Sequence, residues 1–147
     1  KIEHAAPDMH EEKLARELAH TLAHLSGTLA VVVCHERPII HEAGFSQLVR
    51  MRELTEGHVA SDVERIVDII EEQPRAVSAL TEEVAVFING EIPFTRTRHV
   101  SMVVTASALP SGQPLLAALI GPVRMPYNRT VGVLQALHHT FSNHVHA

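Results

Sequence analysis

Leucine residues at helical spacing mark the first regular element of the chain. They are Leu14, Leu18, Leu22 and Leu25. Residues three or four positions apart lie on one face of a helix, so these leucines predict an amphipathic helix. Asp8 and Glu11 form a capping-box pattern before them, and Gly27 is a typical residue just after a helix end. The pattern predicts a helix from about Met9 to Ser26.

Short apolar runs predict the strands of a sheet. The run from Thr28 to Val33 is continuous and rich in β-branched residues, which is typical of a strand that is buried on both faces. The other predicted strands are Pro38 to His41, Val84 to Ile88, Val100 to Ala106 and Pro114 to Ile120. The last three follow one another without room for crossover helices, so we expect a mainly antiparallel sheet.

Three further segments have helical patterns. Phe45 to Leu54 shows weak helical spacing. Ser61 and Glu64 form a second capping-box pattern at the start of an apolar helical face, and Pro74 ends that pattern. A last helix is predicted around Val131 to Phe141. Helices therefore stand at both ends of the chain and between the first two and the last three strands.

The order of these elements predicts an α+β fold. We expect a GAF-like domain, in which the N- and C-terminal helices pack together on one face of the antiparallel sheet. The chain has 147 residues, of which 46% are hydrophobic, and this is enough for a single core. We therefore assign residues 1–147 to one domain, and we expect it to be part of a longer protein because it starts at Lys1 without an initiator Met.

Composition and charge exclude several classes of protein. No apolar run approaches the roughly 18 to 20 residues that span a bilayer, and no secretory signal pattern precedes the first helix. One cysteine fits a reducing compartment, so we expect a cytoplasmic protein without a membrane partner. The net charge is −5, with 12 Lys and Arg residues scattered among 17 acidic residues, and this leaves no basic stripe for phosphates. We expect the chain by itself not to bind DNA.

Histidine and cysteine side chains are the candidates for metal binding or catalysis in this sequence. His20 and His24 are weak candidate metal ligands because i, i+4 spacing puts them on one helix face, which we expect to be solvated. Cys34 and His35 are adjacent in a strand and so point to opposite faces, which argues against a nucleophile with its base. We predict no catalytic residue, no metal and no cofactor. The remaining histidine group is expected to lie on a frayed C-terminal surface: His138, His139, His144 and His146.

The segment GQPLLAALIGPVRMPY, Gly112 to Tyr127, resembles the strand-turn-helix signature near the C-terminus of the HrcA family of heat-inducible transcription repressors. The matching residues are Gly112, Gln113, Pro114, Ile120, Gly121, Pro122, Arg124, Met125, Tyr127 and Arg129. Upstream segments agree with the family in the same order, so the resemblance covers most of the chain from Glu11 to Phe141.

This resemblance implies a regulatory and dimerising domain of a repressor of chaperone genes, which is not an enzyme. The implied partners are a second copy in a homodimer, operator DNA through a winged helix that would precede Lys1, and a chaperonin. The family's dimerising insertion is largely missing, since only Cys34 to Arg37 separate Val33 from Pro38. Whether the chain is a shortened relative or residues are omitted there stays open. The alternative function is a GAF-type sensor of a small molecule.

The residues of this signature also lead to predictions about the structure. Gly121 is expected to adopt a backbone conformation that is closed to residues with a Cβ, and Pro122 to fix φ, so that a buried strand ends there. Arg124 is expected to pair with an acid or with helix carbonyls, and Tyr127 to bury its ring and leave its hydroxyl at the edge. For Arg124, Met125 and Tyr127, a structural role and a contact with a ligand or partner both stay open.

Overall fold

A computed structural model describes residues 9–34, 39–44 and 57–146 of the chain. Its helices are α1 (Met9–Ser26), α3 (Gly57–Glu72), α4 (Pro74–Ala79) and α5 (Tyr127–His146), with a short 3-10 helix η3 (Asn89–Glu91). Its strands are β1 (Leu29–Cys34), β2 (Ile39–Ala43), β3 (Ala85–Ile88), β4 (Val100–Ala108) and β5 (Pro114–Pro122). The helix predicted from Phe45 to Leu54 lies outside the described residues.

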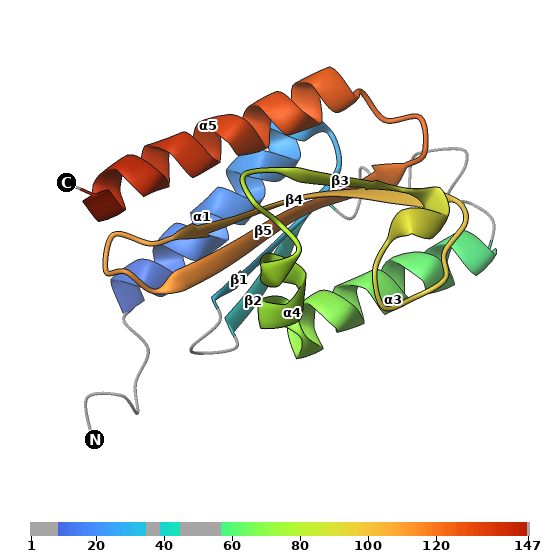
Figure 1. Cartoon of the computed structure of the whole chain (residues 1–147), viewed down its shortest axis with the longest axis horizontal. Helices are drawn as coiled ribbons and strands as arrows, with labels where there is room; N and C mark the ends of the chain where they lie inside the picture. The colour runs from blue at the N-terminus through green and yellow to red at the C-terminus, as the bar shows by residue number, and fades with distance from the viewer. Residues whose placement is uncertain (1–8, 35–38, 45–56, 147) are drawn as a thin grey trace.

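The five strands form one antiparallel sheet in the order β2-β1-β5-β4-β3. Helices α1 and α5 lie side by side on one face, while α3 and α4 cover the other (Figure 1). The predicted α+β, GAF-like arrangement with the terminal helices on one face is therefore confirmed. Of the helices in the described ranges, none is long and apolar enough to cross a membrane.

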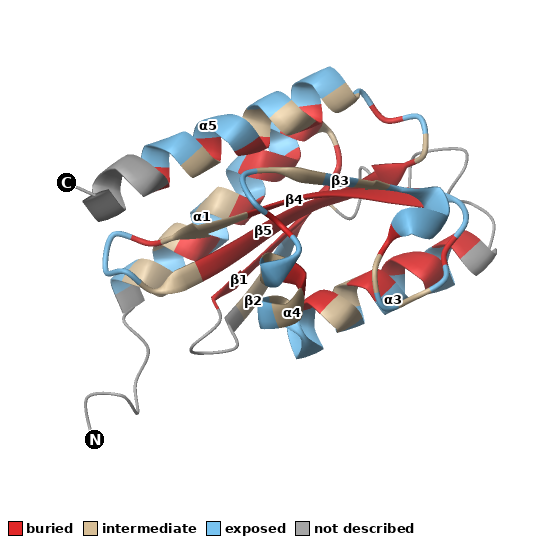
Figure 2. Cartoon of the chain, in the orientation of Figure 1, coloured by how far each residue is buried: buried red, intermediate tan, exposed pale blue. Residues whose placement is uncertain are grey.

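The interior strand β1 is buried on both faces, as its sequence predicts. Its alternate residues enter two separate cores, with Val32 on the side of α1 and α5 and Val31 on the side of α3. Figure 2 shows the buried residues along the inner sides of both helical layers and through the sheet. Each face of the sheet thus has its own hydrophobic cluster, as expected for a sheet covered on both sides.

Helix boundaries show where the sequence patterns were incomplete. Helix α1 has the predicted bounds, but α3 begins at Gly57, so the prediction that Ser61 caps it is wrong. Val59 is buried in the core, and this packing extends the helix by a turn before the capping-box pattern. Pro74 ends α3 as predicted and also begins α4, a position at which proline is favoured.

Candidate functional site

The signature residues lie at the two ends of β5 rather than in one cluster. Gly112, Gln113 and Pro114 lie at the hairpin between β4 and β5, while Gly121 and the residues after it lie at the opposite end. From Pro114 to Pro122 the strand is extended by roughly 26 Å at about 3.3 Å per residue. The structure therefore separates one sequence motif into two sites.

The hairpin end is held by backbone hydrogen bonds. The Gly112 N–H donates to the Leu109 carbonyl at 2.7 Å, and the Leu109 N–H donates to the Gln113 carbonyl at 2.9 Å. Gly112 has φ of +93°, in the region that favours glycine, and Pro114 pairs with Ala108 as the first residue of β5. These contacts give the three hairpin residues a role in the turn.

At the other end of β5, the small size of Gly121 allows the side chains of Met125 and Thr28 to pack closely against it. The expectation of a special backbone conformation is wrong, because Gly121 is not among the glycines with positive φ. A Cβ at this position would lie 3.0 Å from Met125 Sδ and 3.3 Å from Thr28 Cγ2. The buried Met125 side chain therefore packs directly on Gly121, one residue before β5 ends at Pro122.

Tyr127 joins the start of α5 to β4. Its ring is half-buried, and its hydroxyl is hydrogen bonded to the Val123 carbonyl oxygen and to Ser101 Oγ, the latter at 3.0 Å. Ser101 is fully buried, so the hydroxyl is turned inward instead of standing free at the edge. The sequence pattern did not point to Ser101, which is 26 residues away along the chain.

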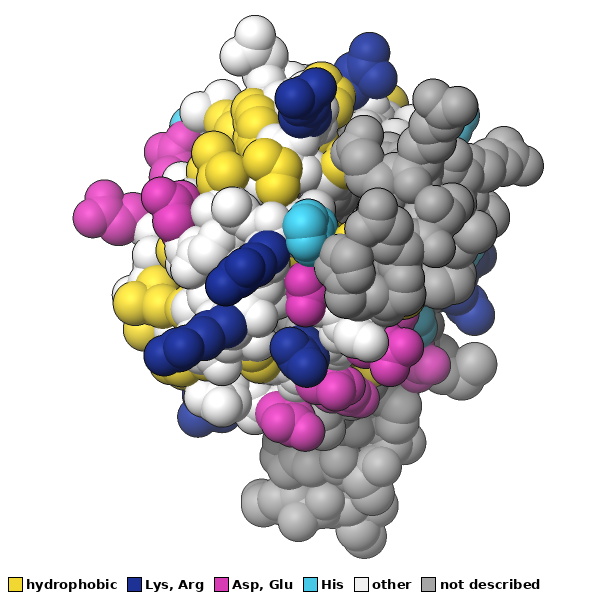
Figure 3. Space-filling model, turned by 90° about the vertical axis from the view of Figure 1, so that its right-hand side faces the viewer, with side chains coloured by type: hydrophobic (Ala, Val, Ile, Leu, Met, Phe, Trp, Pro, Cys, Tyr) yellow, Lys and Arg dark blue, Asp and Glu magenta, His cyan; other side chains and the backbone are white. Residues whose placement is uncertain are grey.

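Arg124 and Arg129 are exposed at this same end. Within the ranges that the structure describes, neither forms an ion pair, so the acid expected beside Arg124 is not found there. Arg129 is in the first turn of α5, where its backbone N–H donates to the Pro126 carbonyl at 3.0 Å. Figure 3 views this side of the molecule, with Lys and Arg side chains gathered near exposed hydrophobic ones.

A second candidate site lies between α3 and the strands β1 and β2. It is a groove of about 190 Å³, here called the acid-lined groove, which is lined by Leu29, Glu42, Val63, Glu64, Val67 and Asp68. Burial raises the pKa of the Glu42 carboxyl above its usual value, and the negative charges of Glu71 and Asp68 raise it further. An apolar floor with acidic walls suits a small ligand that carries a positive charge. Sequence reasoning missed this groove, because no motif links β2 with α3.

His20, His24 and Cys34, which were also considered for a chemical role, are not among the residues of these two sites. His20 and His24 are exposed on α1, and in the described ranges no three potential ligands are grouped to hold a metal ion. Burial, and then the charge of Glu11, raise the pKa of the Cys34 thiol to about 11, so the thiol is neutral near pH 7. A neutral, buried thiol is a poor nucleophile.

The C-terminal histidines divide into two pairs. His138 is half-buried rather than frayed, and its Nδ1 is 3.1 Å from the Ala106 carbonyl oxygen and 3.3 Å from Thr105 Oγ1. The exposed His139 places Nε2 3.3 Å from a carboxylate oxygen of Glu83. The side chains of His144 and His146 lie outside the described part. His138 therefore contributes to the contact of α5 with β4.

Comparison with known proteins identifies a family. Residues 2–131 match the sequence profile of the family described as HrcA protein C terminal domain. A search of curated proteins found no match. The matched range includes both ends of β5, so it contains every residue of the signature.

The fold of this chain is similar to that of a solved structure. A crystal structure of a hypothetical protein has a TM-score of 0.70 and 12% identity, over 90% of this chain and 69% of that chain. An IclR family transcriptional regulator from Brucella abortus has a TM-score of 0.47 and 14% identity, over 90% and 62% of the two chains. A transcriptional regulator from Alicyclobacillus acidocaldarius has a TM-score of 0.47 and 16% identity, over 93% and 68%. The first similarity shows the fold alone, and this chain spans about two thirds of each of these proteins.

Proposed function

Because this chain belongs to the HrcA protein C-terminal domain family, we propose that it is the regulatory and dimerisation domain of a transcriptional repressor of heat-shock genes. The observation that carries the proposal is the family match over residues 2–131, which includes the whole sheet, helices α1, α3 and α4 and the start of α5. Membership supports a role in transcription regulation rather than in catalysis. In the proposed protein, a winged helix ahead of this domain binds the operator, and a chaperonin keeps the repressor active.

Dimerisation explains how such a domain would contribute to operator binding. Two copies related by a two-fold axis hold two winged helices at a fixed distance, and this geometry matches an operator with inverted half-sites. Heat acts through stability, because a domain has only about 5 to 15 kcal/mol of folding free energy and warming reduces it. Loss of the folded dimer then releases the operator.

The outer side of β3 is the surface that we propose for dimerisation. In the described part of the chain, the exposed large hydrophobic side chains are Leu25, Leu80, Val86, Ile88 and Phe94. All but Leu25 lie in or near β3, which is an edge strand of the sheet. Exposed apolar side chains on an open sheet edge are a common basis for association with another chain.

The backbone of β3 supports the same surface. The Ile88 N–H donates to Glu91 Oε1 at 2.9 Å, so the backbone of Ile88 points away from β4. In an antiparallel ladder the backbone of Val86, two residues earlier, points the same way. Val86 and Ile88 are each 38% exposed, so this edge presents two apolar side chains and the outward backbone groups of Val86 to a second copy, while the Ile88 N–H is already bonded to Glu91.

Sedimentation equilibrium of the 147-residue chain tests this surface. We expect a dimer, and we expect Val86→Lys and Ile88→Lys each to raise its dissociation constant about tenfold or more, because a charge would be buried at the interface. The control is Leu25→Lys, an apolar position on α1 that is 51% exposed, which should dimerise like the wild type. A chain that is monomeric at concentrations near 100 μM, or a Leu25→Lys variant that dissociates as readily, would contradict the proposed interface.

DNA binding tests the repressor proposal separately. The isolated chain should not bind the operator, whereas the same domain joined to its winged helix should bind it as a dimer. Val86→Lys in the joined protein should weaken operator binding without changing the winged helix. Tight sequence-specific binding by the isolated chain would overturn the proposed division of roles.

The acid-lined groove favours a second candidate function, a small-molecule sensor. Its ligand would be a short aliphatic amine, with the chain on Leu29 and Val63 and the ammonium group near Glu42. A ligand that binds only the folded state stabilises it by about 2.7 kcal/mol at 100 times its Kd. We expect butylamine to raise the melting temperature of the wild type and not of Glu42→Gln. An equal rise in both proteins would exclude this site.

A further inference from the structure

Five arginines gather at the end of the sheet where β5 ends and β4 begins. They are Arg65, Arg96, Arg98, Arg124 and Arg129, out of eight Lys and Arg residues in the described ranges. Val100 pairs with Pro122, so Arg98 and Arg124 each lie two residues beyond the last pair of these strands. Arg65 belongs to the same region because its guanidinium and the Arg98 backbone both contact Asp62. Asp62 and Glu91 lie at the same end, and Figure 3 shows Asp and Glu side chains close to the Lys and Arg ones on this side of the molecule.

Two of these arginines line a surface hollow. The hollow has a volume of about 570 Å³ and is here called the arginine basin; its lining residues are Asn89, Gly90, Arg96, Thr97 and Arg98. The buried Thr97 donates from Oγ1 to the Asn89 carbonyl at 3.2 Å, and the Arg98 N–H donates to Asp62 Oδ2 at 3.3 Å. The backbone that carries the two arginines is thus held from η3 on one side and from α3 on the other.

The carboxylates beside the arginine basin already contact other groups of this chain. Asp62 accepts the Arg98 N–H and has Arg65 Nη1 at 3.7 Å, while Glu91 accepts the Ile88 N–H. Among the residues that the structure describes, no carboxylate forms an ion pair with Arg96 or Arg98. Both guanidinium groups are therefore available to an external anion.

Helix orientation adds to the positive potential. Helices α3 and α5 both begin at this end of the molecule, and neither has an acidic residue in its first turn (Figure 1). The N-terminal end of a helix carries a partial positive charge, which favours anions and disfavours nearby cations. Arg129 nevertheless stands in the first turn of α5.

We propose that the arginine basin binds a small molecule through a phosphate or diphosphate group held by Arg96 and Arg98. Guanidinium groups bind phosphate oxygens by paired, charge-assisted hydrogen bonds, and two of them match a group with two or more negative charges. The basin is larger than one phosphate, so it has room for the rest of a small molecule. Operator DNA is the poorer occupant, since the winged helix would precede α1, which begins near the other end of the sheet (Figure 1).

An NMR titration of the 147-residue chain with sodium pyrophosphate at constant ionic strength tests the basin. We expect saturable shifts of the backbone amides of Asn89, Gly90, Thr97 and Arg98, and at least tenfold weaker binding in Arg96→Gln and Arg98→Gln. The control is Arg75→Gln, an exposed arginine on α4, which should bind like the wild type. The amide spectrum of each variant also reports whether it is folded.

Three results would overturn the assignment. Shifts that do not saturate, or that spread over the whole surface, would show ionic screening instead of a site. Equal weakening by Arg75→Gln would show that total charge matters and the basin does not. Citrate binding as tightly as pyrophosphate, or a short DNA duplex binding more tightly than either, would exclude a small phosphate compound as the ligand. None of these outcomes depends on whether the chain dimerises through β3, so this inference stands apart from the proposed function.

Discussion

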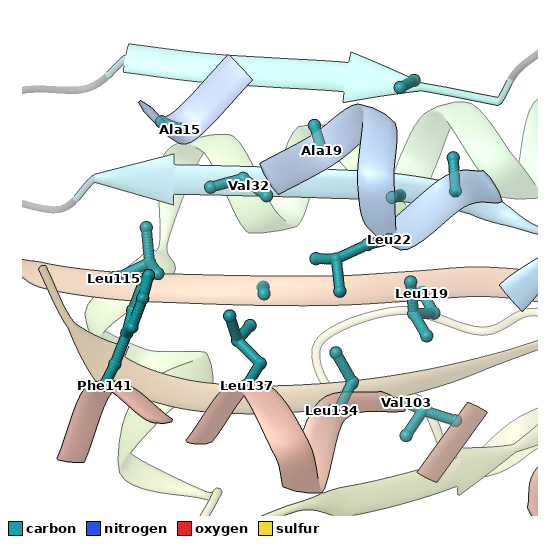
Figure 4. Close-up of a cluster of buried hydrophobic side chains, with 14 of the residues drawn as sticks. Ala15, Ala19, Leu22, Val32, Val103, Leu115, Leu119, Leu134, Leu137 and Phe141 are labelled. Atoms are coloured by element: carbon teal, nitrogen blue, oxygen red, sulfur yellow. The ribbon is translucent and has the colours of Figure 1, made fainter. Parts of the chain in front are cut away.

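Helices α1 and α3 contact opposite faces of the sheet with side chains of different size. Where α1 meets the sheet, small residues lie at the contact, among them Ala15, Ala19, Ala23, Ala30 and Ala117, while α5 beside it contributes large residues such as Leu134 and Phe141 (Figure 4). On the face of α3, the contact is made mainly by larger residues such as Val63, Ile66 and Ile70. Small side chains let a helix approach a sheet closely, whereas large ones hold it farther away.

This difference separates a tightly packed frame from a face that keeps open space. Gly44 packs directly against Ala23 and Thr28 on the first face. On the second face, the acid-lined groove opens between α3 and the strands. The acid-lined groove therefore offers space for a ligand on the α3 face, whereas close backbone and side-chain contacts characterise the α1 face.

Gly44→Ala should have the largest effect, because it disturbs the tightest contact on the α1 face. Gly44 has φ of +91°, and an added Cβ would lie 2.4 Å from the Thr28 carbonyl oxygen and 2.8 Å from Ala23 Cβ. Backbone strain and overpacking together should lower the free energy of unfolding by about 4 kcal/mol or more. Urea unfolding measures the loss.

Gly112→Ala is the matched control for this change. Gly112 has a similar φ of +93°, but nothing lies within 4 Å of an added Cβ, so only the backbone strain of about 1 to 2 kcal/mol remains. Equal losses in the two variants would mean that close packing at Gly44 contributes nothing.

Cavities made on the two faces of the sheet should lower the free energy of unfolding by different amounts. Leu134→Ala on the α5 side should lower the free energy of unfolding by about 3 to 4 kcal/mol, because the surrounding packing cannot close around the space. Ile66→Ala on α3 should cost only about 2 to 3 kcal/mol, since α3 has room to settle. Both side chains are fully or almost fully buried, which makes the comparison fair. A larger loss for Ile66→Ala would reverse the assignment of the rigid face.

Tyr127→Phe should have a smaller effect. It removes the hydroxyl that joins α5 to Ser101 and Val123, and this should lower the free energy of unfolding by about 1 to 2 kcal/mol. Ser101→Ala and the double variant complete a cycle, in which we expect a coupling of at least about 0.5 kcal/mol. Additive losses would show that the two hydroxyls act independently.

The smallest effect should come from His41 at the edge of the α1 face. Burial lowers the pKa of His41 below its usual 6.5; Glu12 opposes this shift, and Arg16 and His20 add to it. The unfolded chain therefore binds the proton more readily, so stability should fall as the pH decreases through 6.5 toward the folded-state pKa. Unfolding measured between pH 7.5 and 5.5 should show a shallower slope in His41→Gln and the wild-type slope in His24→Gln. An unchanged slope in His41→Gln would contradict the prediction.

Much of the fold could be predicted because local patterns and tertiary packing agree. The continuous apolar run of β1 and the spacing of Leu14, Leu18 and Leu22 on α1 matched their final environments, whereas Leu25 at the end of the same pattern is exposed. The start of α3 could not be predicted, because the burial of Val59 extends that helix and no local pattern records it. For the candidate sites, the signature showed which residues matter without showing that they separate to the two ends of β5.

By itself, the sequence determined the order of the main helices and strands, the packing of the terminal helices on one face of the sheet, and the family, but it did not indicate α4 or η3. These follow from periodicity and from short motifs, which act over a few residues. Only the tertiary structure decided that Glu42 meets Asp68 in a groove, that Tyr127 binds Ser101, and that Asp62 holds the backbone of Arg98 36 residues away. These contacts depend on how strands pair and where helices settle on the sheet, and this information lies in the summed packing of the whole chain.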